Sequence, residues 1–347
     1  MIGHKYAALA EQVRAQIRCG HYRDGEKLPS ENELAAATGY SRQTVRQALG
    51  VLEQDGLLER VQGSGTYVRA AAALREATHN IAVVTTYIGE YIFPDILHGI
   101  EGVLAENGYT PLLSATHNRV DNERRILAEL LSKPIDGLIV EGTKTALPNP
   151  NIDLYDHFSR DGIPVVFING FYPDLKKPIY VVADDRAGGR MACEALLQKG
   201  HTQIAGIFKS DDIQGHRRYA GYAEALRGAN LSIQDDHVLW YTTENRGNLL
   251  DVCAPQTLRG CTAAVCYNDE VALHLLRLLQ TAAGAALTPV ELASFDSSTY
   301  AQLSPVPFLS LANPKEKLGR LAAQKMLNLL RGKPEEPTVL PWSPWEG

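Results

Sequence analysis

The sequence predicts a small α+β domain at the N-terminus and a larger α/β domain after it. The first prediction rests on residues 28–68, where two short helix patterns precede two strand patterns and a glycine-rich turn. The second rests on residues 81–296, where apolar strand patterns alternate with helix patterns, as in a parallel sheet. A chain of 347 residues has room for roughly two domains. We therefore expect domains at 1–69 and 80–347, joined by an alanine-rich linker at 70–79.

The N-terminal domain begins with a pattern of two short helices joined by a tight turn. Ser30 and Glu33 have the spacing of a capping box, and Gly39 is placed to end the first helix. Ser41 is placed to cap the second helix, which carries an apolar stripe made of Val45, Ala48, Leu49 and Leu52. This pattern indicates a helix-turn-helix, and an ordinary solvated helix pair is the alternative.

The polar face of the second helix and the segment after it favour a nucleic-acid binder. Arg42, Gln43 and Arg46 lie near the helix N-terminus, where a recognition helix carries its base-reading side chains. Residues 57–61 and 66–68 read as strands joined by a turn at 62–65, which completes a winged helix. The glycines of this turn do not form a nucleotide-binding loop, because the full glycine pattern and a following helix are missing.

These stretches resemble the GntR family of bacterial transcription regulators. The matching pieces are residues 27–34, 41–46, 56–58 and 63–68, and the resemblance covers about residues 4–69. It implies an α+β winged helix-turn-helix domain that binds double-stranded operator DNA. The DNA contacts that it implies, or for which it makes a residue a candidate, are Lys5, Asn32, Ser41, Arg42, Gln43, Thr44, Arg46, Gln62 and Gly63.

The charge distribution puts a limit on how DNA can be bound. The whole chain carries a net charge of −6, with about +1 on residues 1–70 and −7 on the remainder. Because the N-terminal domain is only weakly basic, binding must depend on the local placement of Arg42, Arg46 and Lys5.

Composition excludes several other classes of protein. No apolar run is long enough to span a membrane, and the first residues lack a signal-peptide pattern, so we expect a cytoplasmic protein. The five cysteines contain no CxxC pair, which favours reduced, mostly buried thiols over a zinc site or a redox switch. There is no phosphate-binding loop, metal-ligand cluster or nucleophile elbow, so we expect no cofactor and no enzyme.

In the α/β domain, polar and aromatic side chains follow the predicted strands. Ligands of such sheets bind beyond the carboxyl ends of the strands, so these residues should converge on one site. Carboxylates and amides hydrogen-bond sugar hydroxyls, and aromatic faces pack on sugar rings, although each acid could instead cap a helix. The candidates from this reading are Glu90, Tyr91, Phe93, Glu141, Asn169, Gln214, Asn268 and Asp296.

This second domain resembles the LacI/GalR repressors and the periplasmic sugar-binding proteins. The resemblance covers about residues 80–335 and is carried by residues 196–201, 218–222, 267–273 and 294–296. It implies two similar subdomains that enclose a sugar, with chain crossings near Val182, Leu311 and Pro334. The sugar contacts that it implies are Asn268 and Asp296, then Asn169, Glu141, Arg190, Tyr222, Phe93 and Asn313. Residues 338–347 depart from the usual closing strand of that family.

The pairing of the two domains resembles the arabinose-responsive repressors of Gram-positive bacteria. Stretches at 85–88, 91–94, 121–125, 136–141, 206–209 and 211–212 carry this likeness. It implies a homodimer that represses arabinose-utilisation genes and is released from operator DNA by L-arabinose. Another pentose or hexose, activation instead of repression, a GntR head on an enzyme-like body and a periplasmic transport receptor are the alternatives.

Overall fold

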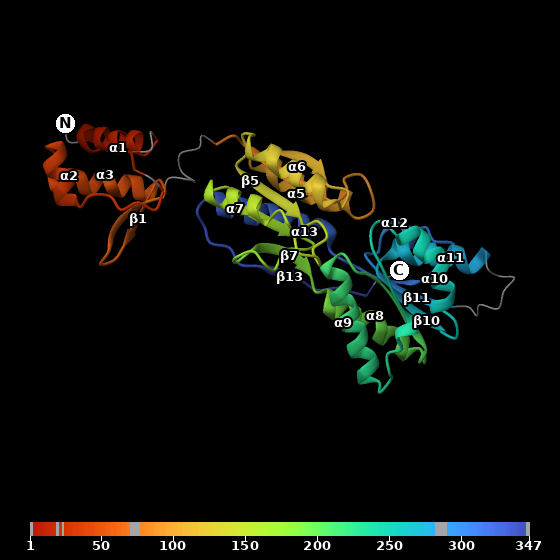
Figure 1. Ribbon diagram of the computed structural model, residues 1–347. Helices are drawn as coiled ribbons and strands as arrows, with labels where there is room; N and C mark the ends of the chain where they lie inside the picture. Colours follow the sequence, from red (N-terminus) through yellow and green to blue (C-terminus); the bar gives the residue numbers. More distant parts are fainter. Residues whose placement is uncertain (1–2, 19–20, 23, 70–76, 282–289, 345–347) are drawn as a thin grey trace. The chain divides into compact units, whose positions relative to one another are not determined.

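The computed structural model describes residues 3–18, 21–22, 24–69, 77–281 and 290–344 (Figure 1). The chain divides into one unit of residues 1–78 and 156–164 and a second unit of residues 79–155 and 165–347. Most of the predicted linker, residues 70–76, lies outside the described residues. Within the described ranges, no helix is both long and apolar enough to cross a membrane.

The N-terminal domain is a winged helix-turn-helix, as predicted. Its elements in chain order are α1 (Gly3–Arg18), α2 (Glu31–Thr38), α3 (Arg42–Gln54), β1 (Leu58–Val61) and β2 (Gly65–Val68). The capping box of α2 is present: Ser30 Oγ accepts from Glu33 N at 3.3 Å, and Glu33 Oε2 accepts from Ser30 N at 2.7 Å. Gly39 ends α2 at a φ of 71°, a left-handed conformation that suits glycine. The apolar stripe of α3 packs against α1 in the core of the domain.

The first subdomain of the body is a six-stranded parallel sheet flanked by helices. The strand order is β13-β7-β6-β5-β3-β4. The strands are β3 (Asn80–Thr85), β4 (Thr110–Ala115), β5 (Gly137–Glu141), β6 (Val165–Ile168), β7 (Ile179–Ala183) and β13 (Thr338–Leu340). The helices in this part of the chain are α5 (Phe93–Glu106), α6 (Val120–Leu131), α7 (Ile152–Arg160) and α13 (Lys315–Leu330).

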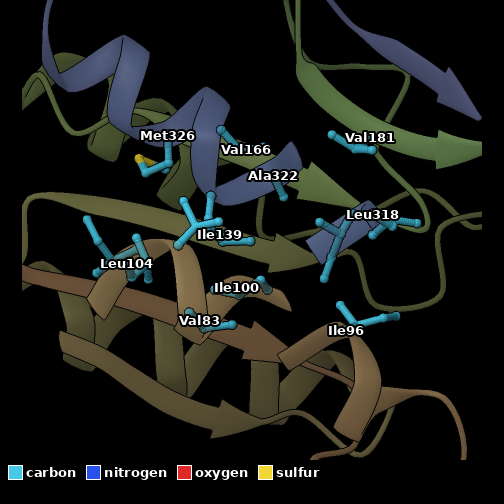
Figure 2. Close-up of a cluster of buried hydrophobic side chains, with 14 of the residues drawn as sticks. Val83, Ile96, Ile100, Leu104, Ile139, Val166, Val181, Leu318, Ala322 and Met326 are labelled. Atoms are coloured by element: carbon cyan, nitrogen blue, oxygen red, sulfur yellow. The ribbon is translucent and has the colours of Figure 1, made fainter. Parts of the chain in front are cut away.

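Helices α5 and α13 pack together on this sheet although they are more than 200 residues apart in the sequence. Figure 2 shows Ile96, Ile100, Leu318 and Met326 beside the sheet residue Ile139 in one apolar cluster. A Cβ on Gly99 would lie 2.2 Å from the Glu316 carbonyl oxygen, so the two helix backbones are in direct contact.

The second subdomain is a five-stranded parallel sheet in the order β12-β11-β10-β8-β9. Its strands are β8 (Ile204–Lys209), β9 (Val238–Tyr241), β10 (Ala263–Cys266), β11 (Glu291–Phe295) and β12 (Leu309–Leu311). Its helices are α8 (Asp185–Gln198), α9 (Ile213–Gly228), α10 (Arg246–Thr257), α11 (Asp269–Thr281) and α12 (Thr299–Gln302), with a 3₁₀ turn at Asp235–His237. The prediction of an α/β body with parallel sheets is therefore confirmed.

The chain passes between the two sheets three times. The first two crossings follow β7 and β12, close to the predicted positions at Val182 and Leu311. The third was expected near Pro334, which is wrong. Residues 338–340 still belong to the first sheet, because β13 pairs with β7 through Thr338 and Val181. The chain crosses only after Leu340, and Trp342 is then buried in the core of the second subdomain.

The described cysteines, Cys193, Cys253, Cys261 and Cys266, are free thiols, and Cys19 lies outside the described residues. Burial raises the pKa of Cys193 to about 12 and that of Cys261 to about 11. A raised pKa keeps a thiol protonated and unreactive near neutral pH. These two cysteines are therefore packing residues.

Candidate DNA-reading surface and ligand cleft

The predicted base-reading arginines lie on the exposed face of α3. The side chains of Arg42 and Arg46 are 61% and 59% exposed, opposite the buried stripe of the helix. Gln43 is exposed beside them, and the other predicted contacts Lys5, Asn32, Gln62 and Gly63 are also exposed. Ser41 is the N-cap of α3, where its Oγ accepts from Thr44 N at 3.2 Å and lies 2.8 Å from Thr44 Oγ1.

Glu31 organises this surface, and its role was not predicted from the sequence. Its carboxylate accepts from Arg46 NH2 at 2.9 Å, from Arg42 Nε at 3.3 Å and from Arg60 NH2 of β1 at 3.4 Å. The hydrogen bond from Arg46, with that from Arg42 and the charges of Arg46 and Arg60, holds the pKa of Glu31 below its usual value, although burial acts in the opposite direction. One acid in the first turn of α2 therefore holds three arginines from α3 and the wing strand. The sequence signal was an acidic residue at a helix start, which is common and not specific.

A cavity of about 350 Å³ lies between the two subdomains of the body. Its size falls in the range of small-molecule sites. It is lined by nine of the eleven predicted sugar contacts: Glu90, Tyr91, Phe93, Glu141 and Asn169 from the first subdomain, Gln214, Asn268 and Asp296 from the second, and Asn313 after β12.

On the first subdomain, Glu141 and Asn169 form one hydrogen-bonded group. Glu141 Oε1 accepts from Asn169 Nδ2 at 2.8 Å, and Glu141 Oε2 accepts from Thr86 N at 2.8 Å. Burial raises the pKa of Glu141, and these hydrogen bonds oppose the shift. Neighbouring groups thus fix the orientation of the carboxylate at the cavity wall.

On the second subdomain, Asp296 and Asn268 face the cavity from the ends of β11 and β10. Asp296 Oδ2 accepts from Tyr91 OH at 2.5 Å, and its backbone has a φ of 95°. Such strained backbone is typical of functional sites. Asn268 Oδ1 accepts from Val271 N at 3.0 Å, which leaves its amide N–H groups for a ligand.

The acids at other strand ends have structural roles. Asp184 caps α8 by accepting from Ala187 N at 3.0 Å. Asp269 is buried and accepts from Ser294 and Ser310 Oγ and from both Ser298 N and Ser298 Oγ, which fixes the loop after Asp296. Burial, with the nearby charge of Asp296, raises the pKa of Asp269 to about 6.

Three cations that line the cavity were not predicted, and each pairs with a carboxylate. Arg218 Nε lies 2.9 Å from Asp185 Oδ1, Lys209 pairs with Asp212, and Arg246 pairs with Glu270. Arg218 follows Gln214 by one helical turn on α9, so helix periodicity could have found it. Lys209 is the last residue of β8 and Arg246 begins the helix after β9, positions where the strand-end rule also applied.

Two predicted contacts lie away from the cavity. Arg190 is on an exposed face of α8, 55% exposed, with Glu194 at 3.9 Å as its ion-pair partner. Tyr222 is 1% exposed, and its hydroxyl donates to the Ile204 carbonyl at 2.7 Å. It lies one turn beyond Arg218 on α9, where the helix is packed in the core of the second subdomain. The assignments of Arg190 and Tyr222 are therefore wrong.

Hydrogen bonds join the two subdomains at both ends of the cavity. At one end Tyr91 OH donates to Asp296 and accepts from Asp269 N at 3.2 Å. At the other, Asn118 Nδ2 donates to Thr243 Oγ1 at 2.6 Å, and Ile213 N donates to Thr145 Oγ1 at 3.0 Å. The body is thus closed around the cavity.

The chemistry of the cavity fits an uncharged polyhydroxyl compound. Its lining holds more carboxylates than cations: Glu90, Glu141, Asp212, Glu270 and Asp296 against Lys209, Arg218 and Arg246. Because those cations already pair with acids, an anionic ligand would meet net repulsion. Among the described residues, no group of three or more His, Cys, Asp or Glu side chains is placed to hold a metal ion.

The fold and the site together define a class of protein: transcription regulators with a winged-helix head and a ligand-sensing body. The family described as "Bacterial regulatory proteins, gntR family" matches residues 5–68, and the "Periplasmic binding protein-like domain" matches residues 193–345. Two arabinose metabolism transcriptional repressors are similar over 94% of this chain. The one from Geobacillus stearothermophilus is 37% identical over 91% of its own length, and the one from Halalkalibacterium halodurans is 36% identical over 89%. The chain belongs to this family of transcriptional repressors, as the sequence predicted, and not to an enzyme family.

Solved structures show the same fold. The transcription regulator CcpA of Lactococcus lactis aligns with a TM-score of 0.68 and 24% identity, over 78% of this chain and 98% of its own. A structure titled as a complex of the transcriptional regulator CelR with cellobiose aligns with a TM-score of 0.66 and 22% identity, over 92% of this chain and 98% of its own.

Proposed function

We propose that this protein represses arabinose-utilisation genes and that L-arabinose is the signal that releases it from DNA. The observation that carries the proposal is the cavity between the subdomains, where Glu141 and Asn169 face Asn268 and Asp296. This set of acceptors and donors suits the hydroxyl groups of a small neutral sugar. The relatives at 36–37% identity, which are named as arabinose metabolism repressors, support the choice of sugar. We expect the protein to act in the cytoplasm without a cofactor.

On the DNA side, we propose a homodimer that binds a near-palindromic operator. Two copies of α3 would then enter successive major-groove turns on one side of the duplex. Arg42, Arg46 and Gln43 are the side chains that reach base edges, and the turn at Gln62 and Gly63 contacts the minor groove beside them.

On the effector side, the sugar acts by changing the population of body conformations. A ligand that contacts both walls of the cavity binds the closed body more tightly than the open one. If the closed body holds the dimer in a geometry that fits the operator poorly, the sugar weakens DNA binding. A coupling free energy of ~1–3 kcal/mol corresponds to roughly 5–150-fold weaker binding.

The test is operator binding with and without sugar. Fluorescence anisotropy on DNA upstream of arabinose-utilisation genes should show release by L-arabinose, with D-xylose, D-ribose and D-galactose as competitors and arabinose 5-phosphate as the anionic control. A saturating sugar, present at ~100 times its dissociation constant, should also stabilise the protein by ~2.7 kcal/mol in a thermal-shift assay. Release by a different sugar would show that this sugar, and not arabinose, is the effector. Tighter DNA binding in the presence of sugar would show that the sugar promotes binding to the operator instead of releasing the protein.

A further inference from the structure

The third crossing segment, residues 340–343, is hydrogen-bonded to both of the other crossings. Asp184 N donates to the Leu340 carbonyl at 2.8 Å, which joins it to the first crossing. Ala312 N donates to the Ser343 carbonyl at 2.8 Å, and Ser343 N donates back to Ala312 O at 3.1 Å, which joins it to the second. Any movement of one subdomain against the other must therefore involve this segment.

Trp342 lies in the middle of this segment and is 5% exposed. Its ring packs edge-on against Phe295, with centroids 5.2 Å apart. On the α8 side, a Cβ on Gly188 would come within 2.6 Å of the indole Cδ1, so α8 carries a glycine where the ring lies against it. The indole N–H makes no hydrogen bond to any described residue. Packing of the ring, and not a polar contact, therefore holds Trp342 in place.

The same indole contacts the guanidinium of Arg218, which lines the cavity. The Arg218 Cζ atom lies 5.1 Å from the Trp342 ring centroid, 4.3 Å from that of Phe295 and 4.8 Å from that of Tyr267. Asp185 holds the guanidinium through Nε, and Asp296 Oδ1 lies 4.0 Å from NH2. Desolvated cation–π contacts of this kind are energetically significant. The direction of Arg218 is thus fixed by three aromatic rings, by the carboxylates of Asp185 and Asp296, and by the Tyr267 carbonyl, which accepts from NH1.

We propose that Trp342 is a positioning residue of the effector site. It holds Arg218 in the orientation that the effector requires, and because it belongs to the crossing segment, it makes that orientation depend on the relative position of the subdomains. Trp342 does not itself line the cavity, so it acts through Arg218. The proposal rests on the proposed function, since it takes the cavity to be the effector site.

The test is a double-mutant cycle on L-arabinose affinity, measured by calorimetry on the full chain. Trp342→Leu should weaken arabinose binding about tenfold, because the Arg218 side chain would then have to be ordered when the sugar binds, and Trp342→Phe should recover part of that loss. Arg218→Lys keeps the charge but loses the planar group. In the Arg218→Lys background, Trp342→Leu should weaken arabinose binding by less than about twofold, because the effects of coupled residues are not additive.

Trp240→Leu is the matched control. Trp240 packs against Phe208, Tyr219 and His216 in the same subdomain and does not line the cavity, so its loss should leave arabinose affinity unchanged. Full additivity of Trp342→Leu and Arg218→Lys, or an equal loss in Trp240→Leu, would overturn the proposal. If Trp342→Leu does not fold, an unchanged affinity in Trp342→Phe overturns it. Absence of arabinose binding by the wild type would instead refute the proposed function.

Discussion

At the residue scale, the acids at the strand ends divide into ligand candidates and structural groups according to their partners. Asp296 faces the cavity and accepts a hydrogen bond from Tyr91 of the other subdomain, whereas Asp269, the first residue of α11, is surrounded by serine hydroxyls. The sequence pattern places both acids after strands, and it does not show which one faces a ligand and which one has a structural role. The distinction depends on which side chains converge in space from β11, β12 and α11, and those serines are distant in sequence.

Asp269 gives the body an unusual pH dependence. Its pKa is raised from 3.8 to about 6 in the folded state, chiefly by burial, so the folded chain binds a proton that the unfolded chain does not bind until lower pH. This group therefore stabilises the fold increasingly as pH falls through 6 towards 4, and the contribution is lost as pH rises. When the pH is lowered from 7 to 5, the unfolding free energy of the wild type, measured in urea, should rise by about 1 kcal/mol relative to that of Asp269→Asn. A difference that is constant or reversed over this range would contradict the assignment.

Arg46 tests the DNA-reading surface. Arg46→Ala should weaken operator binding by ~1–3 kcal/mol if the side chain contacts a base, while L-arabinose binding is unchanged. Arg125→Ala is the control, because Arg125 is an equally exposed arginine of the body, 60% exposed and paired with Glu129. Equal affinities of the two variants in anisotropy titrations would show that α3 is not the recognition helix.

At the scale of elements, the strength of the sequence signal follows the burial of each strand. Strands such as β5 and β8 are buried along nearly their whole length and read as apolar runs. The edge strands β4 and β9 are partly exposed, so their sequences lack that run. Helix α10 has almost no amphipathic pattern and contains Pro255, so its sequence carries little helix signal. β13 was obscured because the chain around it is rich in proline and it forms only three residues of strand.

The contact between α5 and α13 depends on the absence of a side chain at Gly99. Gly99→Ala places a methyl group 2.2 Å from a backbone oxygen of α13, so the helices must separate. We expect a loss of ~1–3 kcal/mol of unfolding free energy. Gly102→Ala in the same helix is the control, since its Cβ would meet only the Arg320 side chain at 3.8 Å. That variant should be neutral or slightly stabilised because alanine favours helix. Equal stabilities in thermal or urea unfolding would refute the close packing.

The link from α2 to α3 and β1 through Glu31 should govern discrimination between DNA sequences. Glu31→Gln frees Arg42, Arg46 and Arg60 and removes a negative charge near the phosphates, so non-specific DNA should bind more tightly and with a steeper salt dependence. The preference for operator over scrambled DNA should fall by ~1–3 kcal/mol.

Glu59→Gln is the control for Glu31. It removes the ion pair with Arg69 on the wing strands and leaves α3 untouched. A preserved preference for the operator in Glu31→Gln, or an equal loss in Glu59→Gln, would show that Glu31 does not orient the reading arginines.

At the scale of the whole molecule, the domain types and most of the cavity were predictable because local motifs carry them. Nine of eleven proposed ligand contacts reach the cavity, since the carboxyl ends of parallel strands necessarily share an edge. The errors at Arg190 and Tyr222 concern which face of a helix is turned toward that edge. The bridging contacts of Tyr91 arise where one subdomain meets the other, which no local pattern encodes.

The central claim is that the closed cavity binds a neutral sugar through Asp296. Calorimetry with L-arabinose on wild type, Asp296→Ala and Asp184→Ala tests it most directly, because Asp184 is also an acid directly after a strand but caps α8 and does not line the cavity. Charge-assisted hydrogen bonds to sugar hydroxyls are worth ~1.5–3 kcal/mol, so Asp296→Ala should lose that much affinity, whereas Asp184→Ala should lose only stability. Wild-type arabinose affinity in a folded Asp296→Ala protein, or no binding of any pentose by the wild type, would contradict the account.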